Sequence, residues 1–129
     1  MKISIIGLGL IGGSYALSLK QRFKNLTLYG WDQNEAHNLE AKNRNLIDVS
    51  CRSLEEALEV GDWILLAIPV NSIASSLSGM LDMLAPHQLI IDFIKYTDGA
   101  SLISSVPGLN DNPQIENILS VKLLPNLLI

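Results

Sequence analysis

Residues 1–32 read MKISIIGLGLIGGSYALSLKQRFKNLTLYGWD. An apolar run over residues 2–6 precedes glycines spaced as G-x-G-x-x-G, and a helical run then leads to a second apolar run that ends at Asp32. This order indicates a strand, a glycine turn, a helix, a second strand and an acid. Asp32 lies twenty residues after Gly12. A glycine turn in this setting, with an acid at this distance, is the fingerprint of a dinucleotide-binding unit.

Each part of the fingerprint has a physical task. Gly7 can adopt backbone angles that a residue with a Cβ avoids, so the chain can turn sharply off the strand. Gly9 lets a pyrophosphate lie against the backbone, and Gly12 lets the helix pack close to the strands. The helix begins near Leu10, so its unpaired N–H groups and positive dipole end face the phosphates. Asp32 can accept hydrogen bonds from both ribose hydroxyls of the adenosine half. The alternative is a glycine turn that only closes a strand–helix corner.

The acid at position 32 also bears on the choice of cofactor. A 2′-phosphate would meet a like charge at Asp32, which costs several kcal/mol unless it is offset. Gln33 follows, where an arginine could have held a phosphate. Lys42 and Arg44 lie further along the chain, and nothing requires them to reach back. We therefore expect NAD, with NADP as the less favoured cofactor.

Length and composition narrow the class of protein. A chain of 129 residues fits one domain, residues 1–129, and a hydrophobic content of 48% suits a sheet covered on both faces. The net charge is −4 without a dominant basic patch, which argues against nucleic acid as a partner. The apolar runs are too short to span a membrane. Cys51 is the single cysteine, so no internal disulfide can form, as expected in the cytoplasm. We predict no metal site.

The remaining chain alternates between strand and helix patterns. Apolar strands are predicted at 26–31, 46–50, 63–68 and 88–93, and helices at 10–22, 34–44, 53–60 and 72–84. The signals weaken over residues 94–129, where a helix at 100–106 and a sixth strand at 118–123 are the best assignments. Alternating β and α elements predict a Rossmann-type, doubly wound parallel sheet. Ligands of such sheets lie beyond the carboxyl ends of the strands, beside the first strand.

Two helix faces can be assigned from the pattern. In the helix at 10–22, the residues expected to face the core are Leu10, Ala16, Leu17 and Leu19. In the helix at 34–44, the residues expected to face solvent are Glu35, His37, Asn38, Glu40 and Lys42.

Several segments resemble one enzyme family. These are Leu10-Ile11-Gly12-Gly13-Ser14, Gly30-Trp31-Asp32, residues 61–70 and Ile90-Ile91-Asp92. Over residues 1 to about 93 the chain resembles the prephenate and arogenate dehydrogenases of tyrosine biosynthesis. The resemblance implies an NAD(P)-dependent oxidative decarboxylation, in which a ring hydroxyl is oxidised by hydride transfer to nicotinamide and carbon dioxide leaves. It also implies that the loop matching residues 67–70 runs beside the nicotinamide side of the cofactor. The predicted cofactor-binding residues are Gly7, Leu8, Gly9, Leu10, Ile11, Gly12, Asp32, Ala67, Ile68 and Pro69.

The chain departs from that family after the fifth predicted strand. The family continues with Asp-x-Gly-Ser-x-Lys, whereas here Asp92 and Phe93 are followed by Ile94-Lys95-Tyr96-Thr97. The family's later His-Pro motif is also missing, so the catalytic residues are unknown. Lys95 is the one weak candidate, and an exposed lysine without a role explains it equally well. A reading-frame change near residue 94, a natural short relative and an excerpt of a longer gene all fit this departure.

The two histidines do not replace the missing motif. His87 precedes the fifth strand, at the amino end of the sheet, and His37 lies on the helix at 34–44, on the adenosine side. Both are expected to be plain surface residues.

Three functions are therefore open. The leading one is the NAD-binding domain of a prephenate dehydrogenase-like oxidoreductase, with little or no turnover by this chain alone. A small-molecule substrate is expected only if a second domain is supplied. The alternatives are a non-enzymatic module that senses NAD(H) for a partner, and the nucleotide domain of another two-domain dehydrogenase. The oligomeric state and the choice between prephenate and arogenate stay open.

Overall fold

The computed structural model describes residues 1–68, 79–92 and 118–120. Pro69, Lys95, the predicted helix at 100–106 and most of the predicted helix at 72–84 fall outside these residues. The elements are β1 (Lys2–Ile6), α1 (Leu10–Arg22), β2 (Thr27–Trp31), α2 (Glu35–Asn43), β3 (Val49–Ser50), α3 (Leu54–Val60), β4 (Trp63–Leu66), β5 (Leu89–Asp92) and β6 (Ile118–Ser120). Residues 79–82 are also helical.

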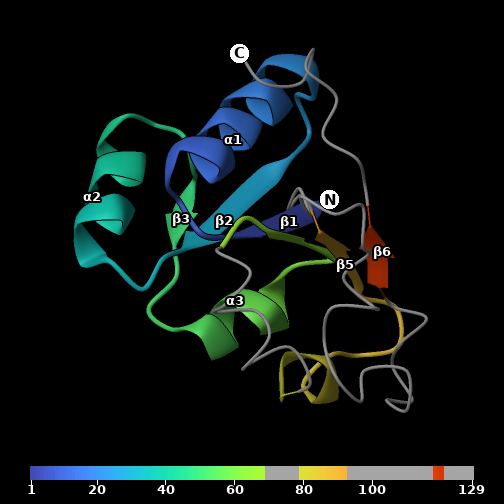
Figure 1. Cartoon of the computed structure of the whole chain (residues 1–129). Coiled ribbons are helices and arrows are strands. Elements are labelled where there is room, and N and C mark those ends of the chain that lie inside the picture. Colours follow the sequence, from blue (N-terminus) through green and yellow to red (C-terminus); the bar gives the residue numbers. More distant parts are fainter. Residues whose placement is uncertain (69–78, 93–117, 121–129) are drawn as a thin grey trace, which may run out of the picture.

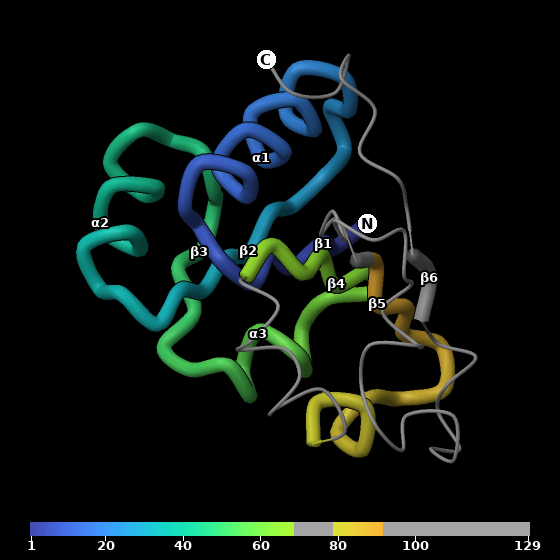
Figure 2. The backbone as a smooth tube through the Cα atoms, viewed as in Figure 1, coloured from blue at the N-terminus to red at the C-terminus, as the bar shows by residue number. Residues whose placement is uncertain are grey.

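The strands form one sheet in the order β3-β2-β1-β4-β5-β6, with every pairing parallel. The tube in Figure 2 places β1 in the middle, with β2 and β3 on one side and β4, β5 and β6 on the other. Helices α1 and α2 cover one face, and α3 covers the other (Figure 1). This is the predicted Rossmann-type, doubly wound sheet, whose strand order reverses beside β1.

The register aligns the carboxyl ends of four strands. Ile6 is opposite Trp31 on one side and Leu66 on the other, and Leu66 is opposite Asp92. The Gly7 N–H donates to the Trp31 carbonyl at 2.8 Å. The segments that follow β1, β2, β4 and β5 therefore start from one edge of the sheet.

Alternate residues of β1 supply the two halves of the core. Ile3 and Ile5 pack in the cluster that includes Tyr15 and Ala16 of α1, and Ile6 packs in the cluster that includes Leu58 of α3. β1 is buried at every position after its first residue, as a central parallel strand should be. Ser4 is also buried, and its hydroxyl donates to the Ala57 carbonyl at 2.6 Å. The buried hydroxyl is therefore paired, as burial requires.

The predicted inward face of α1 is partly wrong. Leu10 is 88% exposed and Leu17 is 37% exposed, whereas Ala16 is buried and Leu19 packs against the core. Leu10 is the first residue of a helix that begins after a three-residue loop past the end of β1, so no strand lies beneath its side chain. The face that packs on the sheet includes Gly12, Tyr15, Ala16 and Leu19, which follow helical spacing.

β2 and β5 differ from their predicted ranges only at the ends, whereas β3 and β4 are shorter than predicted by three and two residues. β3 covers 49–50 because Asn45, with φ of 57°, ends α2 and the Leu46 N–H still donates to the Ala41 carbonyl. β4 ends at Leu66 because its neighbour β1 turns away at Gly7. The sixth strand is present at 118–120, and residues 121–123 of its predicted range are not described.

Candidate functional site

The glycine turn after β1 has the backbone geometry that glycine permits. Gly7 has φ of 98°, which residues with a Cβ rarely adopt. A Cβ at Gly12 would lie 1.8 Å from the Gly7 carbonyl oxygen, so the first turn of α1 packs directly on the loop. The predicted sharp turn and close helix approach are both present.

Gly9 and the start of α1 leave the loop open on its outer side. Among the described residues, no atom lies within 4 Å of a Cβ built at Gly9, so these residues leave room for a ligand to approach the backbone there. Gly9 is the N-cap of α1 and provides no side-chain hydrogen bond, and the first turn contains no acidic residue. The first N–H groups of a helix and its dipole favour an anion, and a pyrophosphate fits these requirements.

Asp32 lies at the end of β2, and its carboxylate points back to the glycine turn. One carboxylate oxygen accepts the Leu8 N–H at 2.7 Å, and the other accepts the Asn34 N–H at 2.7 Å. Partial burial by itself raises the pKa of the Asp32 carboxyl. The hydrogen bonds from Asn34 and Leu8, and the nearby His37, outweigh that effect and hold the pKa below its usual value. The acid is therefore ionised at neutral pH.

Two neighbours of Asp32 were predicted to be surface residues. Asn38 is buried, and its side chain donates to the Asp32 carbonyl at 2.8 Å and accepts the Asp32 N–H at 2.7 Å. His37 is only half-buried, and its Nδ1 lies 3.1 Å from an Asp32 carboxylate oxygen. Both residues belong to the first turns of α2, which starts just after Asp32. That short separation is the one signal in the sequence, and it does not tell which side chains of the helix contact Asp32.

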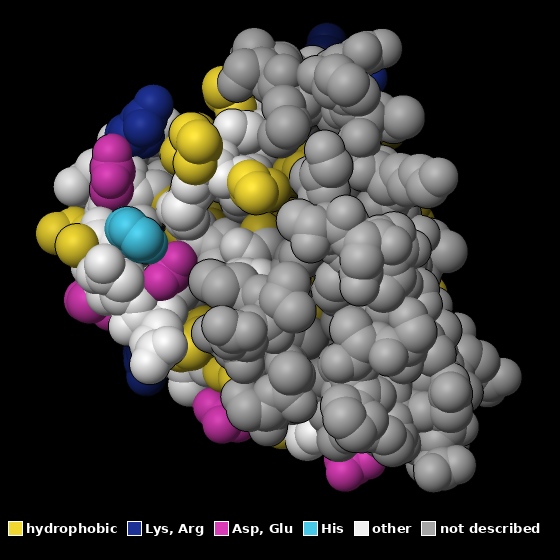
Figure 3. Space-filling model, viewed as in Figure 1, with side chains coloured by type: hydrophobic (Ala, Val, Ile, Leu, Met, Phe, Trp, Pro, Cys, Tyr) yellow, Lys and Arg dark blue, Asp and Glu magenta, His cyan; other side chains and the backbone are white. Residues whose placement is uncertain are grey.

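A groove of about 390 Å³ lies between the N-terminal half of α1 and α2. Leu10, Leu17 and Leu46 supply apolar lining, and His37, Glu40 and Arg44 supply polar groups. Figure 3 shows hydrophobic side chains on this side of the molecule, next to acidic, basic and histidine side chains. The exposed position of Leu10 is thus part of the groove wall.

Other candidate residues lie as follows. The Ala67 N–H donates to the Ile6 carbonyl at 2.8 Å, and Ile68 packs on the core cluster beside α3, so both border the glycine turn. His87 precedes β5, and its Nε2 lies 3.8 Å from Asp62, at the predicted amino end of the sheet.

Two negative findings concern the described parts of the chain. Within residues 1–68, 79–92 and 118–120, no group of three acidic, histidine or cysteine side chains could hold a metal ion. No helix in these segments has the length and hydropathy needed to cross a membrane.

The fold, the glycine turn and the acid after β2 define a nucleotide-binding domain of the dehydrogenase type. The family model for the nucleotide-binding domain of prephenate dehydrogenase matches residues 15–96, which is more than half of the chain. The chain belongs to this family. The match ends close to residue 93, where the predicted resemblance ends.

Individual proteins agree with this assignment. Prephenate dehydrogenase of Lactococcus lactis subsp. cremoris is 41% identical over 70 residues, which are 54% of this chain and 19% of that protein. The arogenate dehydrogenase structure from Synechocystis aligns with a TM-score of 0.68 and 30% identity, over 81% of this chain and 37% of that one. Prephenate dehydrogenase from A. aeolicus, in complex with hydroxyphenyl propionate and NAD⁺, aligns with a TM-score of 0.66 and 25% identity, over 71% of this chain and 32% of that one.

The chain spans between 19% and 37% of the length of these three proteins. The family therefore identifies the nucleotide-binding part.

Proposed function

We propose that this chain binds NAD(H) at the carboxyl edge of its sheet. The glycine turn and the start of α1 hold the pyrophosphate, and Asp32 holds the ribose of the adenosine half. The observation that carries the proposal is the open space at Gly9, directly before an uncapped helix N-terminus. Ala67 and Ile68 border the nicotinamide half. The contact residues of the proposal are Gly7, Leu8, Gly9, Leu10, Ile11, Gly12, Asp32, Ala67, Ile68 and Pro69.

NAD is proposed over NADP because of the charge at Asp32. The carboxylate is ionised and partly buried, so a 2′-phosphate beside it would meet a like charge that water screens incompletely. Arg44 is the cation of the groove lining, but it caps the C-terminus of α2, seven residues after His37, and Glu40 is 3.5 Å from it. This cation is thus already paired with an acid.

The activity proposed for the whole protein is the oxidative decarboxylation of prephenate or arogenate, with bound NAD accepting the hydride. This chain alone is proposed to bind the cofactor with little or no turnover, because the family's Gly-Ser-x-Lys and His-Pro motifs are not in its sequence. The catalytic residue is unassigned, and Lys95 remains a weak candidate. The single cysteine, Cys51, is buried and free, which supports a reducing, cytoplasmic location.

The test is a fluorescence titration of the chain with NADH and, separately, NADPH. Trp31 precedes Asp32, whereas Trp63 lies at the opposite end of the sheet, so a Trp63→Phe variant leaves one reporter beside the site. We expect tighter binding of NADH. Asp32→Asn should weaken NADH binding by about tenfold, the loss expected for a hydrogen bond to a charged group. It should also reduce the preference over NADPH.

Asp62→Asn is the matched control, because this acid lies just before β4 and accepts the Lys2 N–H at the amino edge. Its NADH affinity should equal that of the parent chain. If the chain binds neither NADH nor NADPH, the proposed function is overturned. Reduction of NAD by the chain with prephenate would overturn the proposal that this chain alone turns over little or nothing.

A further inference from the structure

The Asp32 carboxylate already has three hydrogen-bond partners. One oxygen accepts the Leu8 N–H and faces His37 Nδ1, and the other accepts the Asn34 N–H. Because Nδ1 faces a carboxylate oxygen, it must carry a proton, whether the imidazole is neutral or charged. An ionised carboxylate offers about four acceptor positions. One position is therefore open among the described contacts.

A ribose with both hydroxyls on Asp32 needs two acceptor positions, so one present donor has to leave. The Leu8 and Asn34 donors are backbone N–H groups, fixed by the glycine turn and by the start of α2. His37 contributes only a side chain, which is 41% exposed and can change rotamer. The groove between α1 and α2, which His37 lines, has a volume of about 390 Å³ and can receive the ring.

We propose that His37 is a positioning residue that holds the Asp32 carboxylate in the cofactor-free chain and is displaced by the ribose, so that protonation of His37 weakens NAD binding. The inference rests on the proposed function. A neutral imidazole donates one ordinary hydrogen bond to Asp32, whereas an imidazolium also forms an ion pair. At low pH the cofactor has to break the stronger contact, and binding then releases a proton.

Few other groups can produce the same pH dependence. In the part of the chain that the structure describes, the acids and bases around His37 are Asp32 at the end of β2, Glu40 on α2 and Arg44 at its C-cap. The α1 residues that line the groove have no titratable side chain. Asp32 has a lowered pKa and stays ionised at mildly acidic pH. Histidine changes charge between about pH 5 and pH 8, and the sequence contains only His37 and His87.

The experiment measures NAD⁺ binding by calorimetry to the full chain, to His37→Gln and to His37→Ala, from about pH 5.5 to about pH 8.5. His87→Gln is the matched control, because His87 lies at the amino edge beside Asp62. We expect the parent and His87→Gln to bind about threefold more weakly at the acidic end, as a partly exposed ion pair implies. Both His37 variants should bind with an affinity that does not change with pH.

Proton release gives a second readout of the role of His37. Titrations of the parent in buffers of different ionisation enthalpy should show proton release on binding at the acidic end, and the His37 variants should show none. Unchanged pH dependence in the His37 variants, or a flat profile in the parent, overturns the inference while leaving the proposed function intact. Absence of NAD⁺ binding at every pH overturns the proposed function itself. Unfolding curves of each variant establish that it is folded.

Discussion

The two edges of the sheet use similar polar groups in opposite ways. At the amino edge, Gln88 is 4% exposed, and its side-chain amide donates to the Leu58 carbonyl at 2.7 Å and to the Gly61 carbonyl at 2.6 Å. Its amide oxygen accepts the Ala85 N–H at 2.8 Å. At the carboxyl edge, Asp32 is only partly buried, and its contacts with the described residues leave one acceptor position open.

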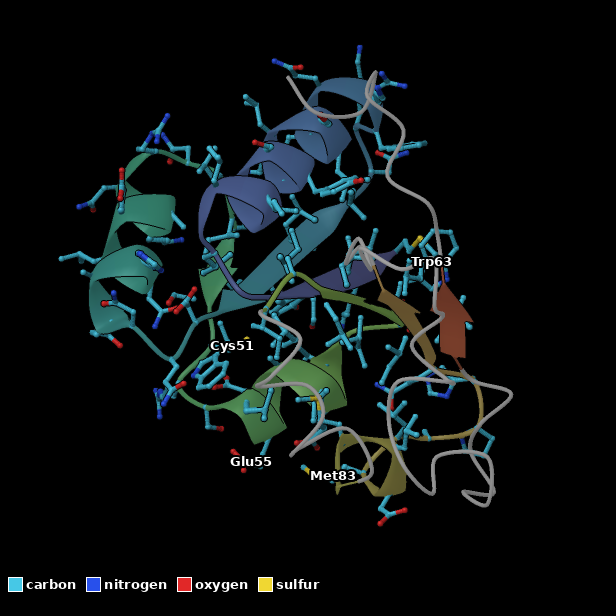
Figure 4. The ribbon with its side chains drawn as sticks, in the orientation of Figure 1. Cys51, Glu55, Trp63 and Met83 are labelled. Carbon is cyan, nitrogen blue, oxygen red and sulfur yellow. The ribbon has the colours of Figure 1, made fainter. Side chains whose placement is uncertain are left out.

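The space beside the polar groups differs as well. At the amino edge, a hollow of about 360 Å³ is lined mainly by apolar groups, among them Met1, Phe23 and Trp63. Figure 4 shows Trp63 there, away from α3 and its Glu55, while Cys51 lies between β3 and α3. At the carboxyl edge, open space adjoins an uncapped helix end and a carboxylate. Polar groups that are fully paired hold the fold together, and those with open positions beside open space define the site.

Gly12→Ala should have the largest effect, and it should fall on the carboxyl edge. The new Cβ would lie 1.8 Å from the Gly7 carbonyl oxygen, a backbone atom that cannot move without opening the turn. We expect a loss of at least about 3 kcal/mol in the free energy of unfolding, together with loss of NADH binding. Urea unfolding followed by circular dichroism measures the first effect.

Gly13→Ala is the matched control in the same helix. A Cβ at Gly13 would lie 3.5 Å from Leu46 Cδ1, an ordinary contact, and alanine favours helix by about 1 kcal/mol over glycine. This variant should be as stable as the parent or more so. Equal stabilities for the two variants would contradict the close packing of α1 on the glycine turn.

Gln88→Ala should be the largest change at the amino edge. It leaves the Leu58 and Gly61 carbonyls without their amide donor in a buried place, which costs about 2–4 kcal/mol. Its folded fraction should bind NADH with the affinity of the parent, because β5 separates it from the glycine turn by the length of the strand. Replacing the adjacent, exposed His87 by alanine should change the free energy of unfolding by less than about 0.5 kcal/mol. If Gln88→Ala also lowered the NADH affinity of the folded protein, the amino edge would not be separate from the binding site.

The sequence allowed the prediction of the sheet and of the relation between Gly7, Gly12 and Asp32. These features depend on local backbone geometry and on strand order, and both leave a pattern within 32 residues. The exposed position of Leu10 could not be predicted, because hydrophobic spacing does not reveal that the first turn of α1 begins beyond the end of β1. The length of β3 depends on where α2 ends and on its pairing with β2.

The contacts of Asn38 and His37 with Asp32 could not be predicted from the hydrophobic pattern either. Both residues lie on a helix whose other polar residues face solvent, and helical periodicity cannot tell which polar side chains turn back over the preceding strand. Their partner is Asp32, whose backbone N–H and carbonyl pair with the Asn38 side chain instead of continuing a strand ladder. Contacts between a helix and the residue that introduces it depend on the loop geometry, which the sequence alone left undetermined.

Gly9→Ala should separate binding from folding. Gly9 has φ of −75°, which alanine adopts readily, and no atom of the described residues lies near the added Cβ. The free energy of unfolding should therefore change by no more than about 1 kcal/mol. The methyl group would occupy the space proposed for the pyrophosphate, and NADH affinity should fall at least about tenfold. Gly79→Ala, whose Cβ would also meet no atom of the described residues, should leave the affinity unchanged. Undiminished affinity in Gly9→Ala would show that the pyrophosphate does not lie against this residue.

A Cys51→Ala substitution tests whether every residue at the carboxyl edge of the sheet contributes to cofactor binding. It directly follows β3, yet its side chain is buried in the core cluster beside α3. Burial, with a smaller contribution from the charge of Glu56, raises the pKa of this thiol to about 11. An unfolded thiol ionises near a pKa of about 8.5, so the stabilisation is complete below that pH and is lost as the pH rises towards 11. Between about pH 7.5 and 9.5, the free energy of unfolding of the parent should fall by about 1 kcal/mol more than that of Cys51→Ala. NADH affinity should be equal in the two proteins, because the buried Cys51 side chain cannot contact a bound cofactor. A weaker affinity in Cys51→Ala would show that the binding site extends to β3.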